Sequence, residues 1–257
     1  MIERREPAAG VTELRLDRPP VNALNPELLT ALEAALAESV EGGARALVVS
    51  GAPGMFSAGL DIPHLLTLDE AGMAEFWERL FGLLARLARS PVPVGFAVTG
   101  HCPAGGTVLA LFGDYRIAAD GDFRLGLNET RVGLPIPPVV FGAYRRLLGP
   151  RMAEQLGVAG RLIAPQEALA AGLVDEVVPP DGVVARAVER AAELASLPRH
   201  AVAATRIEAR ADLVGLFDGI GGADYEQMTA AWFAPETQAE LEKFQARLAA
   251  RKKPAAT

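Results

Sequence analysis

Three residue types are scarce in this 257-residue sequence, and each scarcity excludes a class of site. The single cysteine, Cys102, excludes an intramolecular disulfide framework and a cysteine-rich zinc site, and it is consistent with a reducing compartment. The histidines His64, His101 and His200 are scattered, without the spacing of paired metal ligands. We therefore expect no metal centre.

Lysine is equally scarce, and its placement is informative. Lys243, Lys252 and Lys253 are the three lysines, so any ammonium contact with an anionic ligand must come from the C-terminal tail. With 25 Lys and Arg residues against 32 Asp and Glu residues, the formal charge is −7. This balance argues against a general basic surface for nucleic-acid phosphates.

Long apolar runs and targeting signals are missing as well. No stretch reaches the roughly 18 apolar residues of a membrane span, and the mixed charges near the N-terminus do not lead into a signal-peptide core. The sequence also lacks G-x-G-x-x-G and Walker motifs, which weakens nucleotide-binding readings. We expect a cytoplasmic protein without membrane or nucleic-acid partners.

The hydrophobic pattern predicts an α/β protein, because short apolar strands alternate with amphipathic helices. Asn25 before Pro26 is a strong helix start, with an Asx cap and a proline in the first turn. From about residue 181 onward the pattern is helical. Strands are expected at 11–16, 44–50, 92–99, 115–118, 123–125 and 174–178, and helices at 26–40, 68–88, from 105, and at 181–196, 200–212, 222–232 and 236–251.

Two small-residue turns are candidate sites for backbone hydrogen-bond donors. Ala58 and Gly59 follow a strand and would leave a backbone N–H uncovered, although most such turns merely connect elements. Gly105 opens a helix, whose first N–H groups lack intrahelical partners and can stabilise an anion. Two such donors would form an oxyanion hole. The nearby Cys102 lacks an activating partner, because His101 would point to the opposite face of a strand.

Glu129 is a candidate general base. It lies among apolar and glycine positions, so desolvation would raise its pKa toward neutral pH unless Arg131 pairs with it and lowers the pKa. A solvent-facing glutamate is the alternative without further context.

Taken together, these segments resemble the crotonase (enoyl-CoA hydratase/isomerase) superfamily. The resemblance extends from P-V-N-A-L at 20–24 to A-G-L-V-D at 171–175, and C-P-A-G-G at 102–106 and G-L-N-E-T at 126–130 are most similar to the Δ3,Δ2-enoyl-CoA isomerases. The resemblance implies a ββα spiral core over 1–195 and a C-terminal helical trimerisation region over 196–257. It also implies a homotrimer or dimer of trimers, for which the 236–251 helix with Trp232 and Phe233 offers apolar surface.

The resemblance further implies roles for single residues. Ala58 and Gly105 would supply the oxyanion-hole amides, and Glu129 would be the catalytic acid/base. Coenzyme A would be bound as part of the substrate, with no separate cofactor, beside Asn22, Ala23 and Leu24. Cations would be needed for its phosphates, and two candidates are present. They are Arg18 and the terminal lysines.

One departure from the family pattern favours isomerisation of a 3-enoyl-CoA to a 2-enoyl-CoA. Hydratases that resemble this chain carry a second glutamate at the position of Val108, where it helps to activate water. A lone carboxylate is better suited to moving a proton within the substrate. Hydration or another acyl-CoA reaction stays an alternative, in which Asp61 could act directly rather than cap its turn. A non-catalytic acyl-CoA-binding protein is a third reading.

Overall fold

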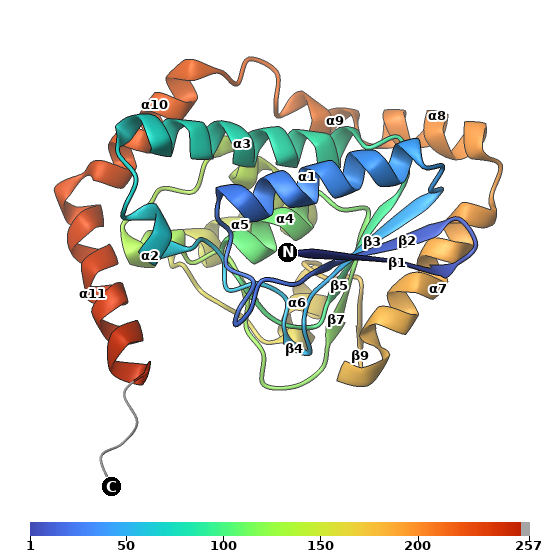
Figure 1. Ribbon diagram of the computed structural model, residues 1–257, viewed down its shortest axis with the longest axis horizontal. Helices are drawn as coiled ribbons and strands as arrows, with labels where there is room; N and C mark the ends of the chain where they lie inside the picture. The colour runs from blue at the N-terminus through green and yellow to red at the C-terminus, as the bar shows by residue number, and fades with distance from the viewer. Residues whose placement is uncertain (253–257) are drawn as a thin grey trace, which may run out of the picture.

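The protein is built around a six-stranded β-sheet (Figure 1). The computed structural model describes residues 1–252, and the strands of this sheet lie in the order β1-β2-β3-β5-β7-β9. The β1–β2 pair is antiparallel, and each later pair is parallel. The strands span Ile2–Ala8 (β1), Val11–Leu16 (β2), Ala46–Ser50 (β3), Val94–Val98 (β5), Tyr115–Ala119 (β7) and Glu176–Val178 (β9).

A smaller sheet joins three short parallel strands, β4, β6 and β8. Each of them directly follows a strand of the large sheet, and each strand pair is followed by helix. This repeated strand, strand and helix unit confirms the α/β class and the ββα spiral expected from the sequence. The strands are Gly54–Met55 (β4), Gly100–Pro103 (β6) and Leu125–Gly126 (β8). After β4 come the helices Ile62–Leu65 (α2) and Glu70–Arg89 (α3), and after β6 comes Gly105–Leu111 (α4). After β8 come the 3₁₀ helix Glu129–Val132 (η1) and the helix Pro138–Val158 (α5).

Helices cover both faces of the large sheet. On one face lies α7 (Val183–Ser196), which follows the 3₁₀ helix Pro180–Gly182 (η2) and buries small side chains such as Ala187 and Ala191 against the strands. On the other face, α1 (Pro26–Glu41) and α3 lie over the main hydrophobic core (Figure 1). Burial of this apolar surface is the main stabilising contribution.

The N-terminus of α1 is formed as the sequence predicts. The Asn25 side-chain oxygen accepts a hydrogen bond from the Leu28 N–H at 3.0 Å, which satisfies one of the orphan donors of the first turn. Pro26 occupies the first helical position, where its missing N–H costs no hydrogen bond. The Asx cap is therefore confirmed.

The C-terminal helices pack on their own chain, which is the alternative to an assembly surface that the sequence left open. Trp232 is fully buried beside Trp77, with ring centroids 6.4 Å apart, and Leu241 is fully buried as well. The last helix contacts η1 and α2 instead of presenting its apolar face to solvent. The helices are Arg199–Ala209 (α8), Ala211–Gly215 (α9), Gly222–Phe233 (α10) and Pro235–Lys252 (α11), and a shorter helix, Pro165–Ala171 (α6), precedes β9.

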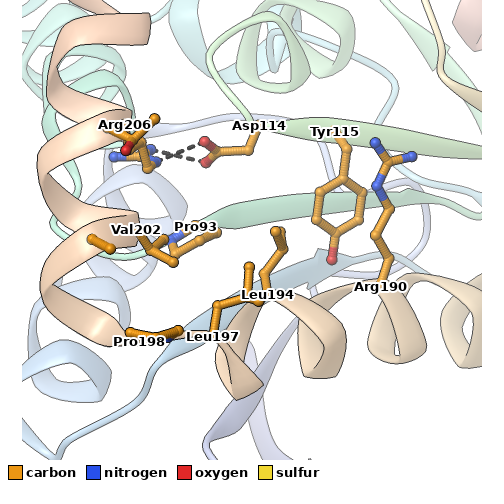
Figure 2. Close-up of a pocket in the computed structure, with 11 residues that line it drawn as sticks. Pro93, Asp114, Tyr115, Arg190, Leu194, Leu197, Pro198, Val202 and Arg206 are labelled. Atoms are coloured by element: carbon orange, nitrogen blue, oxygen red, sulfur yellow. Dashed lines mark hydrogen bonds and ion pairs between the residues drawn. The ribbon is translucent and has the colours of Figure 1, made fainter.

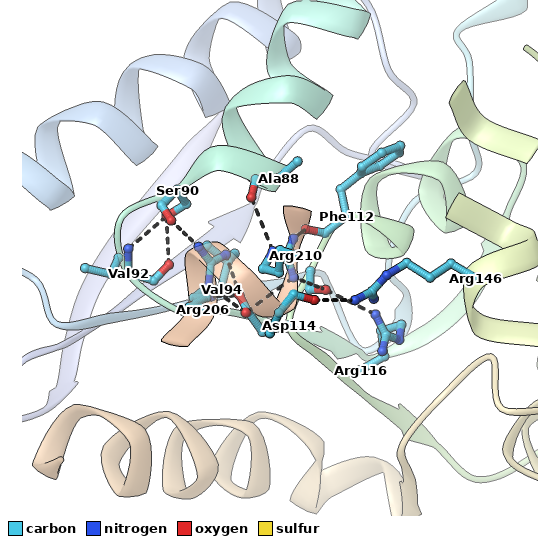
Figure 3. Close-up of polar contacts among 12 residues, drawn as sticks. Ala88, Ser90, Val92, Val94, Phe112, Asp114, Arg116, Arg146, Arg206 and Arg210 are labelled. Atoms are coloured by element: carbon cyan, nitrogen blue, oxygen red, sulfur yellow. Dashed lines mark hydrogen bonds and ion pairs between the residues drawn. The ribbon is translucent and has the colours of Figure 1, made fainter. Parts of the chain in front are cut away.

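A buried ionic cluster ties α8 and the start of α9 to the core (Figure 3). Arg206 makes a forked ion pair with Asp114, with nitrogen to oxygen distances of 2.6 and 2.8 Å. Arg210 also contacts Asp114 and donates to the carbonyl oxygens of Ala88, Phe112 and Gly113.

The division of the chain into a core and a C-terminal region at residue 195 stays a prediction, although side chains on both sides of it belong to the main core.

Candidate active site

Glu129 begins η1, and its carboxylate is buried even though the residue as a whole is only half-buried. Its Oε2 atom has no hydrogen-bond partner within residues 1–252. Burial raises the pKa of Glu129 to about 7, and the backbone N–H groups of Glu129 and Asn128 partly oppose this rise. The carboxyl group therefore titrates in the range that a general base requires at neutral pH.

Arg131 does not pair with Glu129, so the ion pair that would have lowered the pKa of Glu129 is not formed. Its Nε atom donates to the carbonyl oxygens of Gly160, at 2.7 Å, and Ala159, at 3.2 Å. The guanidinium is thus held by the loop after α5. The pKa of Glu129 is therefore governed by burial, which raises it, and not by an ion pair with Arg131.

Tyr144 is a polar neighbour of this carboxylate that the sequence did not indicate. It is fully buried on α5, and its hydroxyl has no partner in the described part of the chain. Burial, and after it the charge of Glu129, raise the pKa of Tyr144 above its ordinary value. Because α5 was not predicted, no sequence pattern linked this residue to the site.

Gly105 lies at the first position of α4, as expected, and its backbone N–H meets no acceptor among the described residues. A Cβ atom there would come within 2.8 Å of Leu24 Cδ1, so a larger residue would not fit without movement. Gly59 lies next to it, because a Cβ atom on Gly59 would be 3.2 Å from the Gly105 nitrogen. The two turns found in the sequence are therefore in contact.

Ala58 does not offer the second amide that was predicted. Its N–H donates to the carbonyl oxygen of Val21 at 2.9 Å, so this donor is already used within the protein. The expectation for Ala58 is corrected for a physical reason: the segment before α1 runs alongside this turn and supplies the acceptor. Sequence alone gives no signal for that pairing, since the two segments are more than thirty residues apart.

Leu60 supplies the available amide in this turn. The Gly59 carbonyl oxygen accepts from the Leu24 N–H at 2.7 Å, and a trans peptide directs the Leu60 N–H to the opposite side. No acceptor for this N–H lies within residues 1–252. The Gly59 carbonyl carbon, which is bonded to the Leu60 nitrogen, is 3.5 Å from the position of a Cβ on Gly105. Unused amides from the two turns thus lie close together.

The three residues predicted to lie by coenzyme A mainly hold this turn in place. The Asn22 side chain is buried, accepts from the Arg18 N–H and donates to the Phe56 carbonyl oxygen. Leu24 is fully buried, and Ala23 is half-buried. The side chains of Asn22 and Leu24 are therefore structural here, and Ala23 keeps partly exposed surface.

Asp61 caps the turn, which was the simpler of its two readings. Its Oδ1 atom accepts from the His64 N–H at 3.2 Å, and its Oδ2 atom is 2.6 Å from an Arg18 nitrogen. Arg18, considered for the coenzyme A phosphates, is thus engaged by Asp61. The side chain of Lys252 and all of Lys253, considered for the same role, lie outside the described residues.

Cys102 is buried, and burial raises its pKa to about 12. The thiolate that a nucleophile needs is therefore not formed at neutral pH. His101 accepts from the backbone N–H of Arg124 through Nδ1 and does not contact the thiol. Val108 is buried on α4, one turn after Gly105, and contributes no carboxylate.

A cavity of about 450 Å³ lies between η1 and α11, and Glu129 is not among the residues that line it. Its lining combines apolar and charged side chains, and Asn128 and Arg131 flank the carboxylate in sequence. A groove of about 530 Å³ lies elsewhere, between α7 and α8, and shares no residue with the site (Figure 2). The lining of the first cavity is Asn128, Arg131, Val132, Glu240, Phe244, Arg247 and Leu248.

The chain is similar in sequence and in fold to known acyl-CoA enzymes. The human mitochondrial enoyl-CoA delta isomerase 1 is 38% identical over 196 residues, which are 75% of this chain and 65% of the human protein. A probable enoyl-CoA hydratase of Mycobacterium avium is 34% identical over 77% of each chain. The crystal structure of human mitochondrial Δ3-Δ2-enoyl-CoA isomerase superposes with a TM-score of 0.93 and 33% identity, covering 98% of this chain and 99% of that chain.

The matched region spans about two thirds of the human relative's length, and the structural match spans nearly all of both chains. The sequence model of the enoyl-CoA hydratase/isomerase family matches residues 6–217, which is most of the chain. The protein belongs to the enoyl-CoA hydratase/isomerase family.

Proposed function

We propose that this protein isomerises 3-enoyl-CoA thioesters to 2-enoyl-CoA thioesters. The observation that carries the proposal is Glu129, whose buried carboxylate has a pKa of about 7. The similarity to the human enoyl-CoA delta isomerase supports the same reaction. The substrate would carry coenzyme A, and the chain's own residues would supply the remaining chemistry.

In the proposed reaction, the thioester oxygen lies between the N–H groups of Leu60 and Gly105. Glu129 removes a proton from C2, and the electron pair moves into the carbonyl to give a dienolate. The two amides stabilise the negative oxygen, at about 3–4 kcal/mol for each such donor. The protonated Glu129 then returns the proton at C4, so that the double bond moves from C3 to C2 and the carboxylate is regenerated.

The absence of a carboxylate at position 108 favours isomerisation over hydration. A hydratase uses a pair of glutamates to position and activate water, and this chain has the buried Val108 at the first of those positions. An apolar side chain there excludes water from that face of the substrate. Hydration stays the second candidate, because a probable hydratase is among the relatives.

Parallel incubations separate these reactions. The purified protein is mixed with a 3-enoyl-CoA and, separately, with the matching 2-enoyl-CoA, and products are followed by chromatography and mass spectrometry. Isomerisation without rapid water addition is the expected result. Rapid water addition to the 2-enoyl-CoA would favour a hydratase, and acyl-CoA binding without exchange of the C2 proton in heavy water would favour a non-catalytic binding protein.

We further propose that copies of the chain associate, as a trimer or a dimer of trimers. Trp232 is buried within its own chain while Phe233 and Phe244 stay partly exposed, and α8 is a second candidate surface because it has no fully buried residue. Ile207 on this helix is 69% exposed. Sedimentation analysis checks the proposal, with a monomer at micromolar concentration as the contrary result.

The cellular compartment stays a prediction. No helix within residues 1–252 is both long enough and apolar enough to cross a membrane. The cytoplasmic location expected from the sequence is tested by fractionation of the native cell.

A further inference from the structure

Arg18 bridges two segments that together form the turn beside the candidate site. Its Nη1 atom donates to the Ala23 carbonyl oxygen at 3.0 Å, and its Nη2 atom is 2.6 Å from Asp61 Oδ2. The ion pair is largely shielded, since the side chain of Arg18 is 27% exposed and that of Asp61 13% exposed. Both terminal nitrogens are therefore used in holding residues 22–24 against residues 59–61.

Asp61 links the ion pair with Arg18 to the neighbouring Leu60 peptide. Its backbone N–H donates to the Leu24 carbonyl oxygen at 2.9 Å, while the Gly59 carbonyl oxygen accepts from the Leu24 N–H at 2.7 Å. Leu60 lies between these two bonds, so its own N–H is directed away from Leu24. Any rotation of the peptide between Gly59 and Leu60 would break one of them.

The turn needs such an external restraint because of Gly59. This glycine has a φ of +88°, in the left-handed region, and it has no side chain to limit rotation of the following peptide. A donor in an oxyanion hole is effective when its direction is fixed before the reaction. The ion pair between Arg18 and Asp61 and the backbone hydrogen bonds with Leu24 together restrict the rotation that Gly59 would otherwise allow.

We propose that Arg18 and Asp61 are positioning residues that fix the direction of the Leu60 N–H toward the substrate carbonyl. The inference rests on the proposed function of that amide, and neither residue is assigned contact with the reacting atoms. Arg18 acts through Asp61 and Ala23. A role for Arg18 in binding coenzyme A phosphates is the competing reading, and it predicts a different kinetic result.

The test compares Arg18→Met with Arg86→Met. Methionine keeps the length and apolar stem of arginine and removes the guanidinium. Arg86 is a matched control, because it pairs with Glu33 at 2.9 Å on the outer side of α1 and α3, away from the site. For Arg18→Met we expect kcat to fall roughly ten- to a hundred-fold, less than for loss of a whole oxyanion donor, with KM changed less than about three-fold.

A spectroscopic measurement makes the test independent of turnover. Hydrogen bonds from the two amides polarise the thioester carbonyl of a bound saturated acyl-CoA carrying ¹³C at that carbon, and so lower its infrared stretching frequency. We expect this lowering in the wild type and in Arg86→Met, and a smaller one in Arg18→Met. Arg18→Lys should recover part of it, because a lysine can reach one of the two acceptors but cannot bridge both.

The outcomes distinguish this inference from the proposed function. A wild type that isomerises, with Arg18→Met equal to it in kcat and in carbonyl frequency, would overturn the positioning role alone. A wild type that polarises the carbonyl without isomerising would overturn the proposed reaction alone. A raised KM with unchanged kcat would assign Arg18 to phosphate binding. If Arg18→Met folds poorly, Asp61→Asn gives the same test, because the amide oxygen can still cap α2 while the charge is lost.

Discussion

Gly59 faces Gly105 so closely that a Cβ atom on Gly59 would lie 3.2 Å from the Gly105 nitrogen and 3.0 Å from Ala104 Cβ. The two glycines let the backbones of separate turns approach closely, and a Cβ atom at either position would crowd this contact. The unused amides of Leu60 and Gly105 depend on this approach.

Gly59→Ala should therefore lower both activity and stability. Alanine at φ +88° costs roughly 1–2 kcal/mol, and its methyl group would displace the Gly105 amide. The control is Gly82→Ala on α3, where nothing lies within 4 Å of the added Cβ and the free energy of unfolding should rise by roughly 0.5–1 kcal/mol. Denaturant titration and turnover measure the two effects. Equal activity of both variants would contradict the close packing described here.

Glu129→Gln should change the pH dependence of stability in a definite direction. The pKa of Glu129 is raised to about 7 in the folded protein from 4.5, so the folded state holds the proton more tightly and wild-type stability falls as pH rises from about 4.5 to 7. Glutamine is uncharged throughout. Relative to wild type, the variant should be up to about 3 kcal/mol more stable above pH 7 and nearly equal below pH 4.5. A constant difference across this range, measured by urea unfolding, would show that the carboxyl is not buried as described.

The same carboxyl should govern the pH dependence of catalysis. A general base must be ionised in the free enzyme, so kcat/KM for a 3-enoyl-CoA should rise with pH and level off above about 7. Initial rates between pH 5 and 9 test this expectation. An ascending limb centred near the ordinary carboxyl pKa would instead indicate a solvated Glu129.

Arg210 should be much more important for stability than Arg146, although both are drawn in Figure 3. Arg210 is buried and bonded to Asp114 and three backbone carbonyls, so Arg210→Met leaves buried acceptors and costs about 3–5 kcal/mol. Arg146 pairs with the exposed Asp212, and Arg146→Met should cost less than about 1 kcal/mol. Thermal unfolding of the two variants tests the contrast, and similar losses would contradict it.

Much of the fold could be predicted because its signals are local. The cap at Asn25 and the glycine pair that opens α4 act over a few residues, and both are as expected. The unpredicted elements lack such signals. In α5 the periodicity is interrupted by Gly149, with a φ of +72°, and Pro150, while β1 is an edge strand with mostly exposed charged residues.

The site was predicted only in part for a related reason. Glu129 and Gly105 could be identified as site residues from their immediate neighbours in sequence. The choice between Ala58 and Leu60 depends on which amide is paired with the segment before α1, and Tyr144 reaches the site through a helix that was not predicted. The roles of these residues depend on contacts between segments that are distant in sequence. The hydrophobic periodicity of the sequence carries no information about such contacts.

Glu129 is proposed to move a proton from C2 to C4 of a bound thioester. The most direct measurement is conversion of a 3-enoyl-CoA by wild type and Glu129→Gln at pH 8, with acyl-CoA affinity measured for both. We expect rapid conversion by the wild type and a loss of at least about a thousand-fold in rate in the variant, with affinity unchanged. Substantial conversion by a folded Glu129→Gln variant would contradict it.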